Sequence, residues 1–212
     1  AGSYTITYSY CEVLNPTNCT GTQTLVVTVG AVTLTVDNDT FNIPDGLTTQ
    51  TTTSVLTNDR LNGNVPTSGV GGTVTITNVV PATPVRTGAK VPELNPNDGK
   101  VTIPANTPAG TYTITYKECE SLNPSSNCHT ATAVIKVGVP TITVTPDPIT
   151  AAPSTSTQTT PSILNNDKIG STVTPTVGVG GNVTLTVTNP SGPGNKPTLD
   201  PNTGKVTIPA NT

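Results

Sequence analysis

The sequence AGSYTITYSYCEVLNP at residues 1–16 returns almost unchanged as AGTYTITYKECESLNP at residues 109–124. In both copies large apolar side chains alternate with threonines, a period of two that is typical of a β-strand with one buried face. Further along, LNPNDGKVTIPANT at 94–107 matches LDPNTGKVTIPANT at 199–212. The chain therefore holds two copies of one unit of about 105 residues, and such self-similarity indicates a repeat protein.

Threonine accounts for 47 of the 212 residues, and glycine and proline for another 19 and 21. Threonine and valine favour pleated strands, whereas glycine and proline favour turns, so the composition predicts an all-β chain with no significant helix. The net charge of −3 and the lack of a Lys/Arg cluster argue against a nucleic-acid-binding protein, which needs a basic surface. No apolar run reaches the length of a membrane span.

Alternating runs of Val, Ile, Thr and Tyr predict about seven short strands in the middle of the chain, the number of an immunoglobulin-like sandwich. These strands are expected near 32–36, 52–56, 73–80, 84–91, 101–103, 111–117 and 131–137. Residues 1–30 then form the closing hairpin of a preceding immunoglobulin-like repeat, residues 31–138 a complete repeat, and residues 139–212 a repeat that lacks its closing hairpin. The expected architecture is a tandem array of immunoglobulin-like β-sandwich repeats.

The missing hairpin of the last repeat leaves two arrangements open. Either the sequence is a window on a longer tandem array, or separate copies donate hairpins to one another head to tail. A sandwich without two of its strands exposes sheet edges and apolar core, which is costly in water. In both arrangements the protein is a linear chain of β modules.

The alternation in each hairpin places three large side chains on one face and threonines on the other. The large side chains, which we expect in the sandwich cores, are Tyr4, Ile6 and Tyr8 in the first hairpin and Tyr112, Ile114 and Tyr116 in the second. The position of Tyr4 and Tyr112 after Ala-Gly also fits the tyrosine corner of immunoglobulin folds. Stacking on sugars is the alternative role for these rings.

The four cysteines form two pairs at matching places in the repeat, on either side of the sequence Leu-Asn-Pro. Their even number and close spacing predict the disulfides Cys11–Cys19 and Cys119–Cys128. Closing a loop of about nine residues stabilises a domain by roughly 2–3 kcal/mol in the chain-entropy model, and disulfides indicate an oxidising, extracytoplasmic compartment. Zinc is the alternative use of four thiolates, but the pairs lie in different modules and lack a CxxC motif.

Catalytic chemistry has little support in the sequence. The single histidine, His129, occurs in one copy of the repeat only, so we expect neither a Ser/His/Asp site nor a resident cofactor. Calcium is the one cation for which the chain offers hard oxygen ligands, and Asp37, Asp39, Asp59 and Asp167 are weak candidates for it. Asp59 and Asp167 also fit turn caps that bond their own backbone.

The string AGTYTITYKECESLNPSSNCHTATAVIKV at 109–137, with SVLTNDRLNG at 54–63, resembles the tandem immunoglobulin-like repeats of giant Bacteroidota cell-surface adhesins, such as the SprB-like gliding-motility adhesins. Those repeats share a VLxND turn, a PAGTYT strand start and a CExLNPxNC hairpin. The resemblance implies export by type IX secretion and display as an extracellular filament at the outer membrane. The matched residues are structural, so they support a stalk and identify no ligand.

We therefore expect a non-enzymatic structural repeat of a filamentous cell-surface adhesin, which acts as a spacer and in surface attachment during gliding motility. Its expected partners are neighbouring repeats of the same polypeptide or like chains head to tail, and surface polysaccharide bound through weak multivalent contacts. The alternative is a subunit of an extracellular fibre that is assembled by hairpin donation between chains. A carbohydrate-binding module is a third class, and it would need an exposed aromatic platform.

Overall fold

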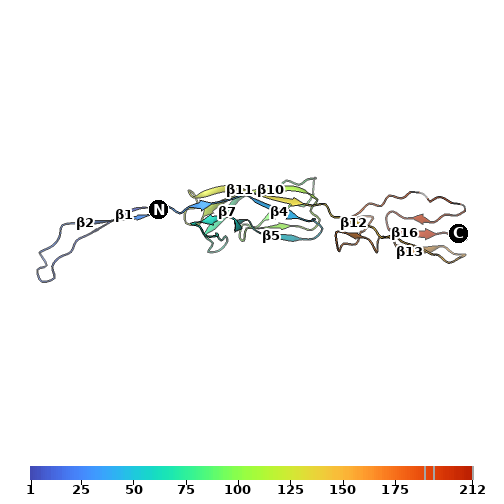
Figure 1. Cartoon of the computed structure of the whole chain (residues 1–212), viewed down its shortest axis with the longest axis horizontal. Coiled ribbons are helices and arrows are strands. Elements are labelled where there is room, and N and C mark those ends of the chain that lie inside the picture. The colour runs from blue at the N-terminus through green and yellow to red at the C-terminus, as the bar shows by residue number, and fades with distance from the viewer. Residues whose placement is uncertain (189, 193, 212) are drawn as a thin grey trace.

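The computed structural model of the protein describes residues 1–188, 190–192 and 194–211. Strands are the main regular structure of this chain, and the one helical element among the described residues is a short 3-10 turn, η1 (Val55–Thr57). The prediction of an all-β fold is confirmed. In Figure 1 a hairpin, a packed central body and a more open C-terminal part follow one another along the long axis.

The N-terminal hairpin consists of β1 (Gly2–Tyr8) and β2 (Gln23–Val29), which pair antiparallel over their whole length. The register sets Tyr4 opposite Val27 and Ile6 opposite Leu25, so these side chains share one face. Every residue of both strands is exposed. The hairpin therefore forms through its own backbone hydrogen bonds and not through burial.

The central body contains a four-stranded sheet in the order β4-β11-β10-β7. Its strands are β4 (Asp39–Ile43), β7 (Val74–Val80), β10 (Gly110–Glu120) and β11 (Cys128–Val137). β10 and β11 form a long antiparallel hairpin, β7 pairs antiparallel with β10, and β4 pairs parallel with β11. The hairpin thus supplies the two inner strands, and both outer strands depend on it for their backbone partners.

A second sheet in the order β5-β9-β8 completes the sandwich. The short strands β3 and β6 form a separate two-stranded sheet. These strands are β3 (Leu34–Thr35), β5 (Gln50–Ser54), β6 (Arg60–Leu61), β8 (Glu93–Leu94) and β9 (Lys100–Ile103). Val101 and Ile103 of β9 and Tyr112 and Ile114 of β10 belong to one buried core. The two sheets therefore pack face to face, as in a β-sandwich.

Buried and exposed side chains alternate along the central hairpin, and its buried side chains make up nearly half of that core. The residues of β10 and β11 that belong to this core, each at most 5% exposed, are Tyr112, Ile114, Tyr116, Ala131, Ala133, Ile135 and Val137. Threonines occupy most of the intervening positions, as expected when one face packs inward and the other faces water. The Tyr/Ile row of this copy lies where the alternation predicts.

The C-terminal part repeats only some of these elements. It contains β12 (Ile142–Thr143) paired with β14 (Lys168–Ile169), and a sheet β13-β16-β15 built from β13 (Gln158–Ser162), β15 (Thr198–Leu199) and β16 (Lys205–Ile208). Gln158 lies opposite Ile208 in the same way as Gln50 lies opposite Ile103. Residues 147–151 and 183–188 correspond to β4 and β7, and both stretches are described without strand structure.

The strand predictions differ from the structure at residues 84–91 and in three short strands, β4, β6 and β8, which they do not include. Residues 84–91 form no strand but belong to a loop, because the prolines at 81 and 84 cannot donate to a ladder and Gly88 has a φ of 74°. Conversely, β4 was not predicted, because Asp39 and Asn42 interrupt its apolar pattern. Residues 39–43 become a strand through their parallel partner β11.

The prediction that Tyr4, Ile6 and Tyr8 lie in a core is wrong for this chain. Their exposed fractions are 56%, 52% and 49%. The alternation is present, but no described sheet covers this face of the hairpin. The same sequence pattern is therefore buried in one copy and open to solvent in the other.

This contrast predicts unequal effects of matched substitutions. Ile114→Ala leaves a cavity in a closed core and should lower the free energy of unfolding by about 2–5 kcal/mol. Ile6→Ala removes the same atoms from an open face and should change it by less than about 0.5 kcal/mol in dilute solution. Urea denaturation of the whole chain followed by circular dichroism measures both, and equal losses would contradict the assignment of the two rows.

Candidate functional site

The parallel pair β4–β11 joins the beginning of the central body to its end. Its register runs from Asp39 opposite Ala133 to Ile43 opposite Val137. One further bond continues the pairing, because the N–H of Gly138 donates to the carbonyl oxygen of Ile43 at 2.8 Å. Figure 1 shows that the chain enters this body at one end and leaves it at the other.

The hydroxyl groups of two buried tyrosines fix the hairpin in place. Tyr112 Oη donates to the carbonyl oxygen of Pro108, four residues upstream, at 2.7 Å. This bond is the mark of a tyrosine corner, which the sequence predicts at Tyr112. Tyr116 Oη donates to Asp39 Oδ2 at 3.0 Å and so links β10 to β4 across the intervening strand.

A disulfide closes the tip of each hairpin, at the cysteine pairs that the spacing predicts. Cys119 and Cys128 face each other directly in the β10–β11 register, with their Cα atoms 4.0 Å apart. Cys11 and Cys19 form the matching pair, with their Cα atoms 3.9 Å apart. No free cysteine exists among the residues that the structure covers. Each disulfide prevents its two strands from separating at the turn.

The tip of the central hairpin is also tied to the start of the module. Asn127 Nδ2 donates to Glu120 Oε2 at 2.8 Å and to the carbonyl oxygen of Val32 at 3.2 Å. The first hairpin has the corresponding local bond, from Asn18 Nδ2 to Glu12 Oε2 at 3.0 Å. The repeat thus preserves the polar structure of the tip together with its disulfide.

Beneath the tip lies a group of buried carboxyl groups. Asp59 and Glu118 are fully buried, and Asp39 is 9% exposed. Asp59 Oδ1 accepts from the N–H of Asp37 at 2.8 Å. Among the described residues, no donor reaches Asp59 Oδ2 or either carboxyl oxygen of Glu118. Such a pair is stable in an apolar interior only if a proton is bound, since two adjacent buried carboxylates repel each other.

Burial is the main cause that raises the pKa of Glu118, to about 9, and the neighbouring Asp59 raises it further. Burial also raises the pKa of Asp59, although the N–H of Asp37 opposes this change. The pKa of Asp39 rises to about 6 for the same reason, against the hydrogen bond from Tyr116. The proton of the pair therefore resides on Glu118, which can donate it to Asp59.

The structure brings together three of the four predicted calcium candidates, Asp37, Asp39 and Asp59, near the start of the module. Asp39 Oδ2 accepts from Tyr116 Oη, and Asp59 Oδ1 accepts from the N–H of Asp37. Asp167, in the C-terminal part, makes the bond that matches Asp59, with the N–H of Thr145 at 2.8 Å. Within the described ranges, no three His, Cys, Asp or Glu side chains form a group suited to a metal ion.

Two details of this site differ from the sequence analysis. The sequence favours turn caps at Asp59 and Asp167, but each side chain instead accepts from the backbone N–H of a residue 22 positions upstream, just after a short strand. Glu118 was not predicted, because the first copy has Tyr10 at this position and acidic residues in a strand usually face water. Its position two residues beyond Tyr116 in the strict alternation is the feature that places it inside.

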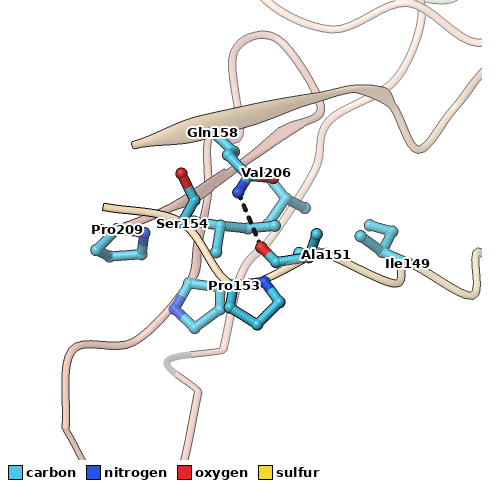
Figure 2. A pocket seen from close by; sticks show the side chains of 10 residues that line it. Ile149, Ala151, Pro153, Ser154, Gln158, Val206 and Pro209 are labelled. Carbon is cyan, nitrogen blue, oxygen red and sulfur yellow. Dashed lines mark hydrogen bonds between the residues drawn. The ribbon is translucent and has the colours of Figure 1, made fainter. Parts of the chain in front are cut away.

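The C-terminal part contains an open groove of about 340 Å³. Figure 2 shows Ile149 and Val206 at this groove, with Gln158 Nε2 donating to the carbonyl oxygen of Ala152 at 3.0 Å. The repeat aligns Ile149 and Val206 with Phe41 and Val101, which pack in the closed core of the central body. The groove therefore lies on the face of the C-terminal part that corresponds to the core side of the central body.

The buried carboxyl pair predicts a stability that falls as the pH rises. Glu118 has a pKa of about 9 when folded, whereas an unfolded glutamate titrates near 4.5, so the folded state holds the proton more tightly. The resulting stability is present in acid and is lost as the pH rises toward 9. Since a tenfold change in proton affinity is worth about 1.4 kcal/mol, the chain should lose at least about 2 kcal/mol between pH 5 and pH 9.

Glu118→Gln keeps a neutral donor toward Asp59 at every pH. In urea denaturation this variant should keep only the fall that Asp39 contributes around its pKa of about 6, and its profile should be nearly flat from pH 7 to pH 9. The matched control is Glu93→Gln, which changes an exposed glutamate of β8 and should retain the fall of the wild-type chain. A wild-type stability that rises from pH 5 to pH 9 would show that Glu118 is ionised in the folded state.

No family model and no curated protein matches the chain. Among the described residues, no helix is long and apolar enough to cross a membrane.

Proposed function

We propose that the chain is a load-bearing structural repeat of a filamentous cell-surface adhesin, a non-enzymatic spacer that carries tension between the cell and a surface. The observation that carries this proposal is the parallel pairing of β4 with β11. A protein that transmits tension needs resistance between the two ends of each module, and this pair lies between those ends.

Tension along the chain would load the β4–β11 pair in shear. Force enters β4 at Asp39, its N-terminal end, and leaves β11 at Val137, its C-terminal end. Because the strands are parallel, the two forces point in opposite directions along the strands, and all the hydrogen bonds between them share the load. Rupture then requires several bonds to break at once, which slows forced unfolding.

The hairpin tip supports the same interpretation. The Cys119–Cys128 disulfide and the bonds of Asn127 keep β10 and β11 together at the end opposite the exit of the chain. β11 can therefore not peel away from β10 while β4 pulls on it. Two disulfides in a short chain also fit an extracytoplasmic location, where such bonds persist.

Single-molecule force spectroscopy tests the load-bearing role on the whole chain. With handles at the two chain ends, the central body should unfold at a high force because its terminal strands are sheared. With handles on the side chains at Asn38 and Thr130, which both lie near the beginning of the parallel pair, the same contacts should open one after another at a clearly lower force. Equal forces in the two directions would contradict the proposal.

The disulfide identifies the unfolding event in the same experiment. While it is intact, the eight residues 120–127 stay closed off and do not contribute to the extension. Reduction should lengthen the step by about 25–30 Å, since an extended residue spans at most about 3.3–3.6 Å. If reduction of the disulfide does not change the length of an unfolding step, that step comes from another part of the chain.

A further inference from the structure

The central body and the repeat that follows it are joined by a linker of two residues. The last backbone bond of the central body is made by the N–H of Gly138, which donates to the end of β4 at 2.8 Å. The first backbone bond of the next repeat is made by Thr141, whose carbonyl oxygen accepts from the N–H of Gly170 at 2.7 Å. The residues between these two bonds are Val139 and Pro140.

The backbone of this linker has little conformational freedom. The ring of Pro140 fixes its own φ and keeps the residue before it, Val139, out of the helical region. The branched side chain of Val139 also favours an extended backbone. At the start of the linker, a Cβ atom on Gly138 would collide with the carbonyl oxygen of Pro44, so the chain leaves the central body close to the end of β4. Such a linker is a short, stiff spacer, unlike a flexible glycine-rich one.

The two modules also touch each other beside the linker. Gly170, which directly follows β14, lies against the turn that follows β4 in the central body. A Cβ atom built on Gly170 would be 3.0 Å from Leu47 Cδ1 and 3.4 Å from Asp45 Oδ2. The side chain of Leu47 therefore packs on the backbone of Gly170, at a place where any side chain would crowd it.

The turn that carries Leu47 is held in place by hydrogen bonds within the central body. The N–H of Leu47 donates to Asp45 Oδ1 at 3.0 Å, and Gln50 Nε2 donates to the carbonyl oxygen of Asp45 at 2.6 Å. The carbonyl oxygen of Gly46 accepts from the N–H of Thr107 at 3.2 Å, which ties the turn to the segment between β9 and β10. Leu47 is thus presented to the next repeat from a fixed backbone.

The burial of the next repeat agrees with a packed contact. Ile169, the neighbour of Gly170, is 4% exposed. Leu61 occupies the same place in the central body and is only partly buried, although its own module has a closed core. The greater burial of Ile169 is the result expected when a turn of the preceding module covers this end of the repeat.

The contact between the modules is narrow, and Leu47 lies at its centre. On one side Leu47 lines a hollow together with residues 171–173 of the next repeat. On the other side it lines a second hollow together with residues 180–182. Because both flanks are open, the orientation of the two modules depends strongly on this one side chain and on the linker.

We propose that the packing of Leu47 on Gly170 and the stiff linker of residues 139–140 form a fixed joint, which holds the two consecutive repeats in one orientation. The interaction surface is the turn of residues 45–48 at the end of one repeat, and its partner is the turn after β14 at the start of the next. The joint concerns the orientation of modules and does not depend on the load-bearing role proposed above. A hinge at this place would leave the shear resistance of the β4–β11 pair unchanged.

Residual dipolar couplings of the backbone amides, measured on the whole chain in a weakly aligning medium, test the joint. If the two modules form one rigid unit, the couplings of the sheet β4-β11-β10-β7 and those of the sheet β13-β16-β15 fit a single alignment tensor. Two tensors of clearly different size in the wild-type chain would overturn the proposal, because they would show that the modules move independently.

Gly170→Asn tests the contact while it preserves the turn, because Asn62 occupies the same place in the central body with a φ of 51°. The new side chain displaces Leu47, so the couplings of the sheet β13-β16-β15 should shrink while those of the central body stay the same. The matched control is Gly63→Asn, which also changes a glycine of positive φ, 83°, but has no atom within 4 Å of the added Cβ. This control should keep the single tensor.

Leu47→Ala removes the contact from the other side and should have the same effect as Gly170→Asn. Its control is Leu122→Ala, which truncates a leucine that is 87% exposed at the hairpin tip and should leave the couplings unchanged. Amide chemical shifts of β13 and β16 show in each variant that the sheet is still formed. If neither Leu47→Ala nor Gly170→Asn alters the couplings, the linker alone sets the orientation and the role assigned to Leu47 is wrong.

Discussion

Packing of the β10–β11 hairpin against β9 and its neighbours is the interaction on which the rest of the module depends. The hairpin contributes the Tyr112, Ile114 and Tyr116 row to the core and gives both outer strands their backbone partners. Its disulfide and the Tyr112 bond to Pro108 hold it rigid at both ends. A chain with few aromatic residues obtains a closed core in this way, by concentrating them on one covalently stapled element.

Comparison of the C-terminal part with the central body shows which elements form from local sequence alone and which form only where the hairpin is present. The 3-10 turn begins with a bond from the N–H of Leu56 to Ser54 Oγ, and the C-terminal half has the same bond between Leu164 and Ser162. Short hairpins and caps of this kind satisfy their own hydrogen bonds. In contrast, the counterparts of β4 and β7 lack strand structure in the C-terminal half, because their partners belong to another element.

The same distinction explains how much could be predicted from the sequence. The β1 and β10 strands and the cysteine pairs follow from local alternation and spacing, so they were predictable. The short strand β4 was not, since only its parallel partner β11 makes residues 39–43 extended. The role of Glu118 depends on Asp59, which is distant in sequence, and the burial of Tyr4 or Tyr112 depends on whether a second half covers the hairpin.

Amide hydrogen exchange of the whole chain in dilute solution, with both disulfides intact, tests the central role of the hairpin most directly. The account predicts slow exchange in β10, β11 and β4, and fast exchange in residues 147–151, although the two copies of β4 occupy the same place in the repeat. It also predicts intermediate protection in β13 and β16, which form without a hairpin. Equal protection of residues 39–43 and 147–151 would contradict the account, because it would show that β4 folds without the hairpin.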